Sequence, residues 1–168
     1  MTLYEASVPH FQRMLGNVER WLDAAVTQAG KRKFDPEVLV SSRLAPDQWA
    51  LARQIGGACD TAKFTVARLC AKDAPKHSDD QKTLGELRAR IHSVLGFLAG
   101  FRADDFAGSA ERVIAPPVLA GKEVLGRVYL FEMQLPNFYF HATTAYAILR
   151  HNGIELGKWD YLGTITTR

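Results

Sequence analysis

The residues best suited to chemistry lie in an apolar stretch near the C-terminal end of the chain, residues 135–153. Asn137, His141 and Thr144 follow one another at intervals of four and three residues, so a helix would place all three on one face. Apolar and aromatic residues surround them on every side, which is typical of a helix enclosed by protein. The sequence therefore predicts a buried helix that presents an amide, an imidazole and a hydroxyl to a pocket.

A second set of polar residues lies in an earlier helical stretch. Gln54, Ala58 and Thr61 share one helical face by the same rule. Asp60 follows a run of small residues, and burying its charge there would be costly without a partner. We consider two roles for Asp60: a general base, or a carboxylate tied to a basic side chain or a helix end.

Common metal and nucleophile motifs are missing from the sequence. A metal site needs three or four ligands, and His141 has only amide and carboxylate residues as companions. There is no His-x-x-x-His pair, no Glu-x-x-His repeat, no serine nucleophile elbow and no phosphate-binding glycine loop. A lone histidine in an apolar helix is more often a hydrogen-bonded core residue than a ligand, so both roles stay open for His141.

Four helices are predicted to position these residues. Apolar residues recur at helical intervals over residues 3–30, 47–71, 84–101 and 126–152. Pro9 and Pro136 predict a bend or break in the first and last of these helices. With 168 residues, of which 47% are hydrophobic, the chain is long enough to bury a core. We predict an all-α four-helix bundle that forms a single domain over residues 1–168.

Local signals refine the first three helices. Thr2 with Glu5, and Thr83 with Glu86, have the spacing of a capping box at a helix start. Two adjacent glycines, residues 56–57, lie inside the second helix, where each costs roughly 1 kcal/mol relative to alanine. They indicate either the close approach of another helix or a ligand, or a loosely formed helix.

The remaining segments are predicted to be extended or irregular. Residues 110–125 read as a short extended or hairpin insertion between the third and fourth helices, in which Val118–Ala120 pairs with Val124–Leu125. Prolines in this insertion favour edge strands. Residues 72–82 are polar and predict a solvated loop, and residues 154–168 predict a tail without helix that packs across the bundle.

Composition excludes several classes of partner. The formal charge of +3, from 21 basic and 18 acidic residues, is too balanced to predict nucleic-acid binding. No stretch predicts a membrane span or a secretory signal. Cys59 and Cys70 lie about 16 Å apart along one predicted helix, too far to form a disulfide. Free thiols favour a reducing compartment, so we predict a cytoplasmic protein.

Several segments together resemble one known family. They are Arg43–Asp47, Ala58–Asp60, Pro136–His141, Leu149–Ile154 and Asp160–Leu162. Over nearly the whole chain, the sequence resembles an uncharacterised bacterial branch of the DinB/YfiT-like superfamily, a domain-of-unknown-function family. This resemblance implies a four-helix bundle in up-down-down-up order that is often a homodimer. The superfamily is described as metal-dependent enzymes that include thiol transferases and bacillithiol-related S-transferases.

The sequence departs from the metal-binding members of this superfamily. Those members carry one histidine on the second helix and a His-x-x-x-His pair on the fourth. His141 matches the second histidine of the pair, whereas Asn137 stands at the first position and Gln54 at that of the second helix. Neutral amides bind divalent metals much more weakly than imidazole does, so the resemblance implies an incomplete metal site.

Three functions stay open at this point. The first is a pocket for a small molecule or thiol at a degenerate metal site formed by Gln54, Asp60, Asn137 and His141. The second is a metal-dependent transferase or hydrolase that uses His141 with Asp60 and a divalent metal such as zinc or nickel. The third is a structural or stress-related homodimer without a catalytic site. No nucleic-acid or membrane partner is predicted for any of them.

Overall fold

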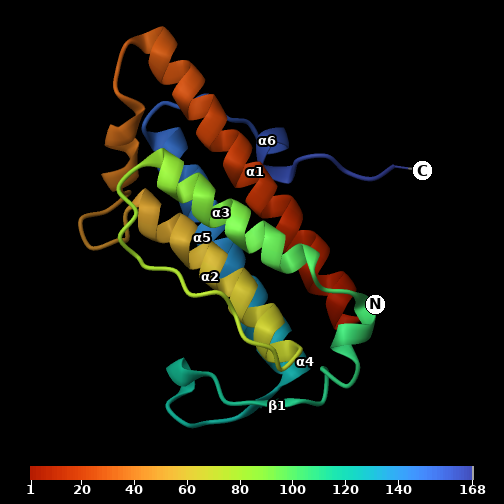
Figure 1. The fold of residues 1–168 in the computed structure, drawn as a ribbon. Helices are drawn as coiled ribbons and strands as arrows, with labels where there is room; N and C mark the ends of the chain where they lie inside the picture. The colour runs from red at the N-terminus through yellow and green to blue at the C-terminus, as the bar shows by residue number, and fades with distance from the viewer. Residues whose placement is uncertain (168) are drawn as a thin grey trace.

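A computed structural model describes residues 1–167 of the chain. They form a mostly helical structure with four long helices that run side by side (Figure 1). These are α1 (Leu3–Arg32), α2 (Leu51–Leu69), α3 (Leu84–Ala99) and α5 (Leu135–His151). Helix α2 packs against each of the other three, and its contact with α5 is the most extensive. The two helices that carry the predicted site residues therefore lie against each other.

Shorter elements connect the long helices. In chain order they are the 3-10 helices η1 (Pro36–Ser41) and η2 (Ala103–Phe106), strand β1 (Val113–Ile114), the 3-10 helix η3 (Pro117–Leu119), strand β2 (Val124–Leu125), helix α4 (Gly126–Val128), the π-helix η4 (Tyr129–Gln134) and helix α6 (Lys158–Leu162). The two strands, η3, α4 and η4 all lie in the connection between α3 and α5, at the end of the structure where α2 ends (Figure 1).

Helix α1 begins as predicted but passes through Pro9 without a break. The Glu5 backbone N–H donates to the Thr2 hydroxyl at 3.1 Å, and the Thr2 N–H donates to the Glu5 carboxylate at 2.7 Å, which confirms the capping box. Pro9 removes one backbone hydrogen bond, whereas Val8 and Phe11 beside it are almost fully buried. Because burial of this face outweighs one missing hydrogen bond, the predicted break is wrong.

Helix α2 begins later than predicted. Its first residue is Leu51, whereas the sequence predicted a start at Asp47. The Leu51 N–H donates to the Ser42 carbonyl oxygen at 2.9 Å, which ties the helix start to the preceding connection. As a result of this later start, Trp49 lies on the connection before α2 and not on the helix.

The starts of α3 and α5 follow from local signals. Helix α3 begins after the capping box that Thr83 and Glu86 form, as predicted. Pro136 lies in the first turn of α5, where its missing N–H is tolerated. The π-helix η4 directly precedes α5, so the helical backbone changes from π to α close to the proline at which a bend was predicted.

A small antiparallel sheet confirms an insertion between α3 and α5, but with a different pairing. Strands β1 and β2 pair with Ile114 opposite Val124. The predicted first strand, Val118–Ala120, is wrong because Pro117 begins the 3-10 helix η3. The fixed φ of proline favours such a turn, and the hairpin therefore closes over a longer loop than the sequence suggested.

The C-terminal residues pack across α1. Trp21 is fully buried, and its Nε1 donates to the Asp160 carbonyl oxygen at 2.9 Å. Asn17 Nδ2 donates to the Tyr161 carbonyl oxygen at 2.7 Å. Both carbonyl groups belong to α6, so the prediction that this tail has no helix is wrong: a helix of 5 residues is too short to show a period. Arg168 lies outside the described residues.

The two cysteines are free and buried. Burial raises the pKa of Cys59 to about 12, so its thiol stays protonated at neutral pH and is a poor nucleophile. Between residues 1 and 167, no helix combines the length and the apolarity that crossing a bilayer requires.

Candidate functional site

The glycine pair of α2 lets two side chains approach its backbone. A Cβ atom at Gly57 would lie 2.9 Å from Cε1 and Nε2 of His141, on α5. A Cβ atom at Gly56 would lie 3.0 Å from Nη1 of Arg90, on α3. Of the two explanations that the sequence left open for these glycines, close approach is confirmed.

His141 is held in one tautomer. The ring is buried, and its Nδ1–H donates to Gln54 Oε1 at 2.8 Å. Gln54 is oriented in turn, because its Nε2 donates to the Trp49 carbonyl oxygen at 3.3 Å. Burial lowers the pKa of His141, and the nearby Asp60 only partly offsets this effect. The imidazole is therefore neutral at pH 7, and Nε2 keeps its lone pair without a protein donor in residues 1–167.

Trp49 covers the ring of His141. The two rings stack with 5.5 Å between centroids and 5° between planes. The guanidinium of Arg53 lies over Trp49, 4.4 Å from the ring centroid. Arg53 also pairs with Asp79 at 2.8 Å. Together these side chains narrow a pocket of about 190 Å³, here called the His141 pocket. It is lined by Trp49, Arg53, Gly57, Asp60, Thr61, Asp79, Asn137 and His141.

Asp60 is tied to basic side chains. Its two carboxylate oxygens lie 2.7 Å from Lys63 Nζ and 2.8 Å from Arg90 Nη2. Both cations have side chains that are only 2% exposed, whereas that of Asp60 is 30% exposed. Two cations already pair with its oxygens. The geometry therefore fits a carboxylate tied to basic side chains better than a general base.

Arg90 also binds the loop between α2 and α3. Its Nη1 donates to the Ser78 carbonyl oxygen at 2.9 Å, to Asp79 at 2.9 Å and to Gln81 Oε1 at 2.8 Å. Burial alone would lower the pKa of Arg90, but its hydrogen bonds to Asp60 and Asp79 outweigh burial and raise it. The loop that the sequence predicted as solvated is thus fixed along one side by a buried cation.

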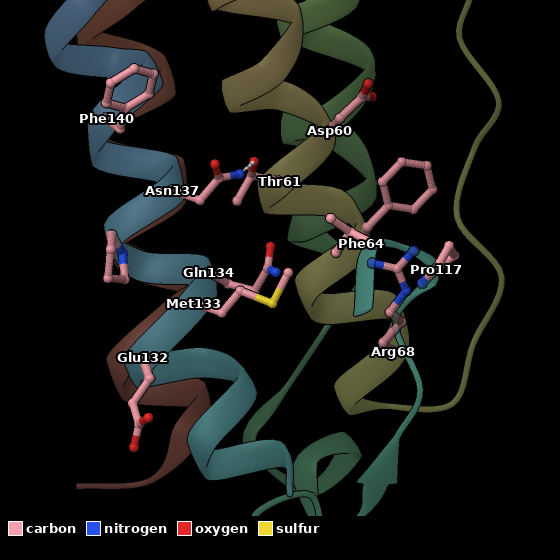
Figure 2. Close-up of a pocket in the computed structure, with 12 residues that line it drawn as sticks. Asp60, Thr61, Phe64, Arg68, Pro117, Glu132, Met133, Gln134, Asn137 and Phe140 are labelled. Carbon is pink, nitrogen blue, oxygen red and sulfur yellow. Dashed lines mark hydrogen bonds between the residues drawn. The ribbon is translucent and has the colours of Figure 1, made fainter. Parts of the chain in front are cut away.

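Asn137 reaches from α5 to α2. Its Nδ2 donates to the Thr61 hydroxyl at 2.7 Å (Figure 2). That hydroxyl donates to the Gly57 carbonyl oxygen at 2.7 Å. Beyond this bridge lies a wider pocket of about 760 Å³, here called the Arg68 pocket. Both pockets are lined by Asp60, Thr61 and Asn137, so they adjoin along the same face of α2 and α5.

The structure places the four predicted residues close to one another. Asp60, Asn137 and His141 line the His141 pocket, whereas Gln54 lies behind the imidazole and orients it. The sequence reasoning missed Trp49. Its aromatic ring beside a turn was a visible signal, but its position over His141 depends on the late start of α2.

The fold and the site have relatives among known proteins. The family described as "Domain of unknown function (DUF1993)" matches residues 3–162. A crystal structure of a DinB family member protein from Shewanella denitrificans is 49% identical, with 99% of this chain and 94% of that chain covered and a TM-score of 0.95. This chain belongs to the DinB family. The resemblance inferred from the sequence is confirmed. No match was found among curated proteins.

The donor set of this DinB family protein does not fit a metal ion. The residues that the superfamily resemblance assigned to the three ligand positions are Gln54, Asn137 and His141, and they provide one imidazole and two amides. The Gln54 oxygen already accepts the proton of His141, and the Asn137 amide nitrogen binds Thr61. Across residues 1–167, no group of three or more His, Cys, Asp or Glu side chains is arranged to hold a metal. Amides are weak ligands for first-row divalent metals.

Replacing Gly57 by alanine is expected to lower the free energy of unfolding by about 1–3 kcal/mol, because the added methyl group would overpack the His141 ring. The displaced ring would also separate from Trp49, so tryptophan fluorescence should change. As a matched control, Gly96→Ala on α3 adds a methyl group with no neighbour within 4 Å and should stabilise the helix by up to about 1 kcal/mol. Equal effects of the two substitutions would contradict the contact.

Stability is expected to fall below about pH 6.5, the ordinary pKa of histidine. Burial lowers the pKa of His141, and burial followed by the charges of Lys63 and Arg90 lowers that of His77. As the pH falls through this range, the unfolded chain binds protons that the folded chain does not, so the folded state loses stability. Urea unfolding at pH 8 and pH 5.5 measures the loss.

The histidine origin of this loss can be separated from that of the carboxylates. His141→Gln and His77→Gln should each lose less stability between pH 8 and pH 5.5 than the wild-type protein does. His92→Gln, at an exposed position, is the control. If all three variants follow the wild-type curve, His141 and His77 are not responsible for the loss.

Proposed function

We propose that this DinB family protein is a single four-helix-bundle domain, in up-down-down-up order, that binds a small molecule in the His141 pocket. The path of the chain in Figure 1 supports this order, because α1 and α5 run toward one end of the structure and α2 and α3 run toward the other. The observation that carries the function is the neutral imidazole of His141, whose Nδ1–H is fixed by Gln54 while Nε2 has no hydrogen-bond partner among residues 1–167.

The chemistry of the pocket limits the ligand. A neutral imidazole with a free Nε2 lone pair accepts a hydrogen bond from a hydroxyl, an amide N–H or a thiol. The stacked ring of Trp49 covers one side, and a volume of about 190 Å³ admits only a small group. We infer that the His141 pocket takes the hydrogen-bond-donating end of a ligand whose remainder extends into the Arg68 pocket.

Thermal melting tests this function. The melting temperature should rise with at least one compound in a panel of small thiols, alcohols and amides, because a ligand that binds only the folded state stabilises it. The same compound should have no effect on His141→Ala, whereas His92→Ala should respond as the wild-type protein does. A panel without any response, or a response that survives in His141→Ala, would contradict the function.

A metal-dependent transferase or hydrolase, the alternative that the superfamily resemblance implied, is disfavoured because Asp60 is already paired with Lys63 and Arg90. Elemental analysis of protein purified without chelator, and then exposed to zinc, nickel and manganese, distinguishes such an enzyme from a ligand-binding protein. About one metal ion per chain, lost in His141→Ala, would favour the enzyme over the ligand-binding protein. The homodimer stays a prediction, and sedimentation equilibrium of the same sample would test it.

A further inference from the structure

Arg68 is a cation held in a fixed position at the wider pocket. Its Nη1 donates to the Tyr129 hydroxyl at 2.7 Å, and its guanidinium carbon lies 5.1 Å from the ring centroid of Phe64. Tyr129 is fully buried, which fixes the hydroxyl that Arg68 binds. A planar guanidinium oriented in this way presents its remaining N–H groups in a defined direction.

No acidic side chain in residues 1–167 forms an ion pair with Arg68. Two carboxylates line the same pocket, those of Asp60 and Glu132. Asp60 forms ion pairs with Lys63 and Arg90. Glu132 extends away from Arg68 in Figure 2. An oriented arginine without a carboxylate partner is suited to bind an oxyanion from outside the protein.

The rest of the pocket is mostly apolar. Its apolar lining residues are Phe64, Pro117, Val118, Met133, Pro136 and Phe140 (Figure 2). The volume of about 760 Å³ is within the usual range for small-molecule sites. An adjoining pocket shares Asp60, Phe64 and Arg68 and is also lined by Lys63, Lys72, Lys76 and Asp73. Lys63 and Lys72 are paired with Asp60 and Asp105.

We propose that the Arg68 pocket binds carboxylates with an apolar body, the carboxylate on Arg68 and the body against Phe64, Met133 and Phe140. This inference rests on the proposed function and names the class of its ligand. Charge-assisted hydrogen bonds of an arginine to a carboxylate are short and stronger than neutral ones. A neutral compound with the same apolar body would lose these charge-assisted hydrogen bonds and would leave the guanidinium without a carboxylate partner.

Isothermal titration calorimetry with octanoate and octanamide tests the assignment, because the two compounds share an apolar chain and differ in charge. Octanoate is expected to bind the wild-type protein roughly 10- to 100-fold more tightly than octanamide. Arg68→Met should remove this difference while it keeps octanamide binding. Tyr129→Phe should reduce the difference, since it removes the hydroxyl that orients Arg68. Arg102→Met, at an exposed arginine outside the pocket, should change nothing.

Each failure has its own meaning. Equal binding of octanoate and octanamide to the wild-type protein, or an unchanged preference for octanoate in Arg68→Met, would overturn the assignment and leave the proposed function intact. The assignment would also be overturned if octanoate did not bind while a panel compound stabilised the protein through His141. If neither compound binds and no panel compound raises the melting temperature, both the assignment and the proposed function fail. Circular dichroism spectra check that Arg68→Met and Tyr129→Phe are folded.

Discussion

Replacing Arg90 by alanine is expected to lower the free energy of unfolding by about 3–5 kcal/mol, the usual cost of removing one partner from a buried ion pair. The Arg90 side chain is 2% exposed and binds Asp60 at 2.8 Å and Asp79 at 2.9 Å. Without it, the Asp60 carboxylate keeps only Lys63, and the Ser78 carbonyl oxygen loses a donor at 2.9 Å. Urea unfolding followed by circular dichroism measures the change.

Arg88 provides a matched control for Arg90. It lies on the same helix and pairs with Asp23 at 2.6 Å, but the two side chains are 29% and 63% exposed. Pairs that are open to solvent contribute at most about 1 kcal/mol, so Arg88→Ala should have a small effect. Amide exchange should also become faster in residues 78–81 in the Arg90 variant alone. Similar losses of stability in both variants would contradict the role assigned to Arg90.

Replacing Trp21 by alanine is expected to cost about 3–5 kcal/mol, as for other large aromatic side chains in a core. Trp21 is fully buried. Its ring stacks on Tyr161 at 5.6 Å and meets Tyr146 edge-on at 5.4 Å, and its Nε1 donates to the Asp160 carbonyl oxygen. Because the contacts with Tyr161 and Asp160 join α1 to α6, the C-terminal residues should become more open to proteolysis in the variant.

Trp159 serves as the control for Trp21, since it is a tryptophan on α6 itself and is 71% exposed. Its replacement by alanine should change the free energy of unfolding by no more than about 0.5 kcal/mol. The loss of unfolding free energy in Trp21→Phe should fall between those of Trp21→Ala and Trp159→Ala, because phenylalanine keeps an aromatic ring but not the indole donor. A C-terminal segment that stays equally resistant to protease in Trp21→Ala would contradict the role of this contact.

Local sequence signals predicted the helices well because these signals act over three or four residues. The capping boxes at Thr2 and Thr83 are present where they were predicted, and α3 begins at Leu84 as expected. Predictions that balanced a local preference against packing did less well. The helix continues through Pro9 because Val8 and Phe11, before and after it in the chain, are buried on one face. No local rule contains that information.

The same division applies to the site. Helical spacing places Asn137 and His141 on one face of α5, and the resemblance to the superfamily placed Gln54 at the matching position of α2. The sequence could not give the hydrogen bond of 2.8 Å from His141 to Gln54, because that bond depends on the rotation of α2 against α5. Nor could it choose between the two roles considered for Asp60, since Arg90 comes from a third helix.

By itself, the sequence predicted a mostly helical chain, because residue types and short-range spacing carry that information. Its resemblance to the DinB/YfiT-like superfamily gave the family, now confirmed, and implied a metal site that lacks two histidines. Only the tertiary structure decided how those positions are used. The close approach at Gly57, the cover of Trp49 on His141 and the orientation of Arg68 by Tyr129 each join residues from different elements. Such contacts arise from the packing of whole helices, which spacing along a single helix does not encode.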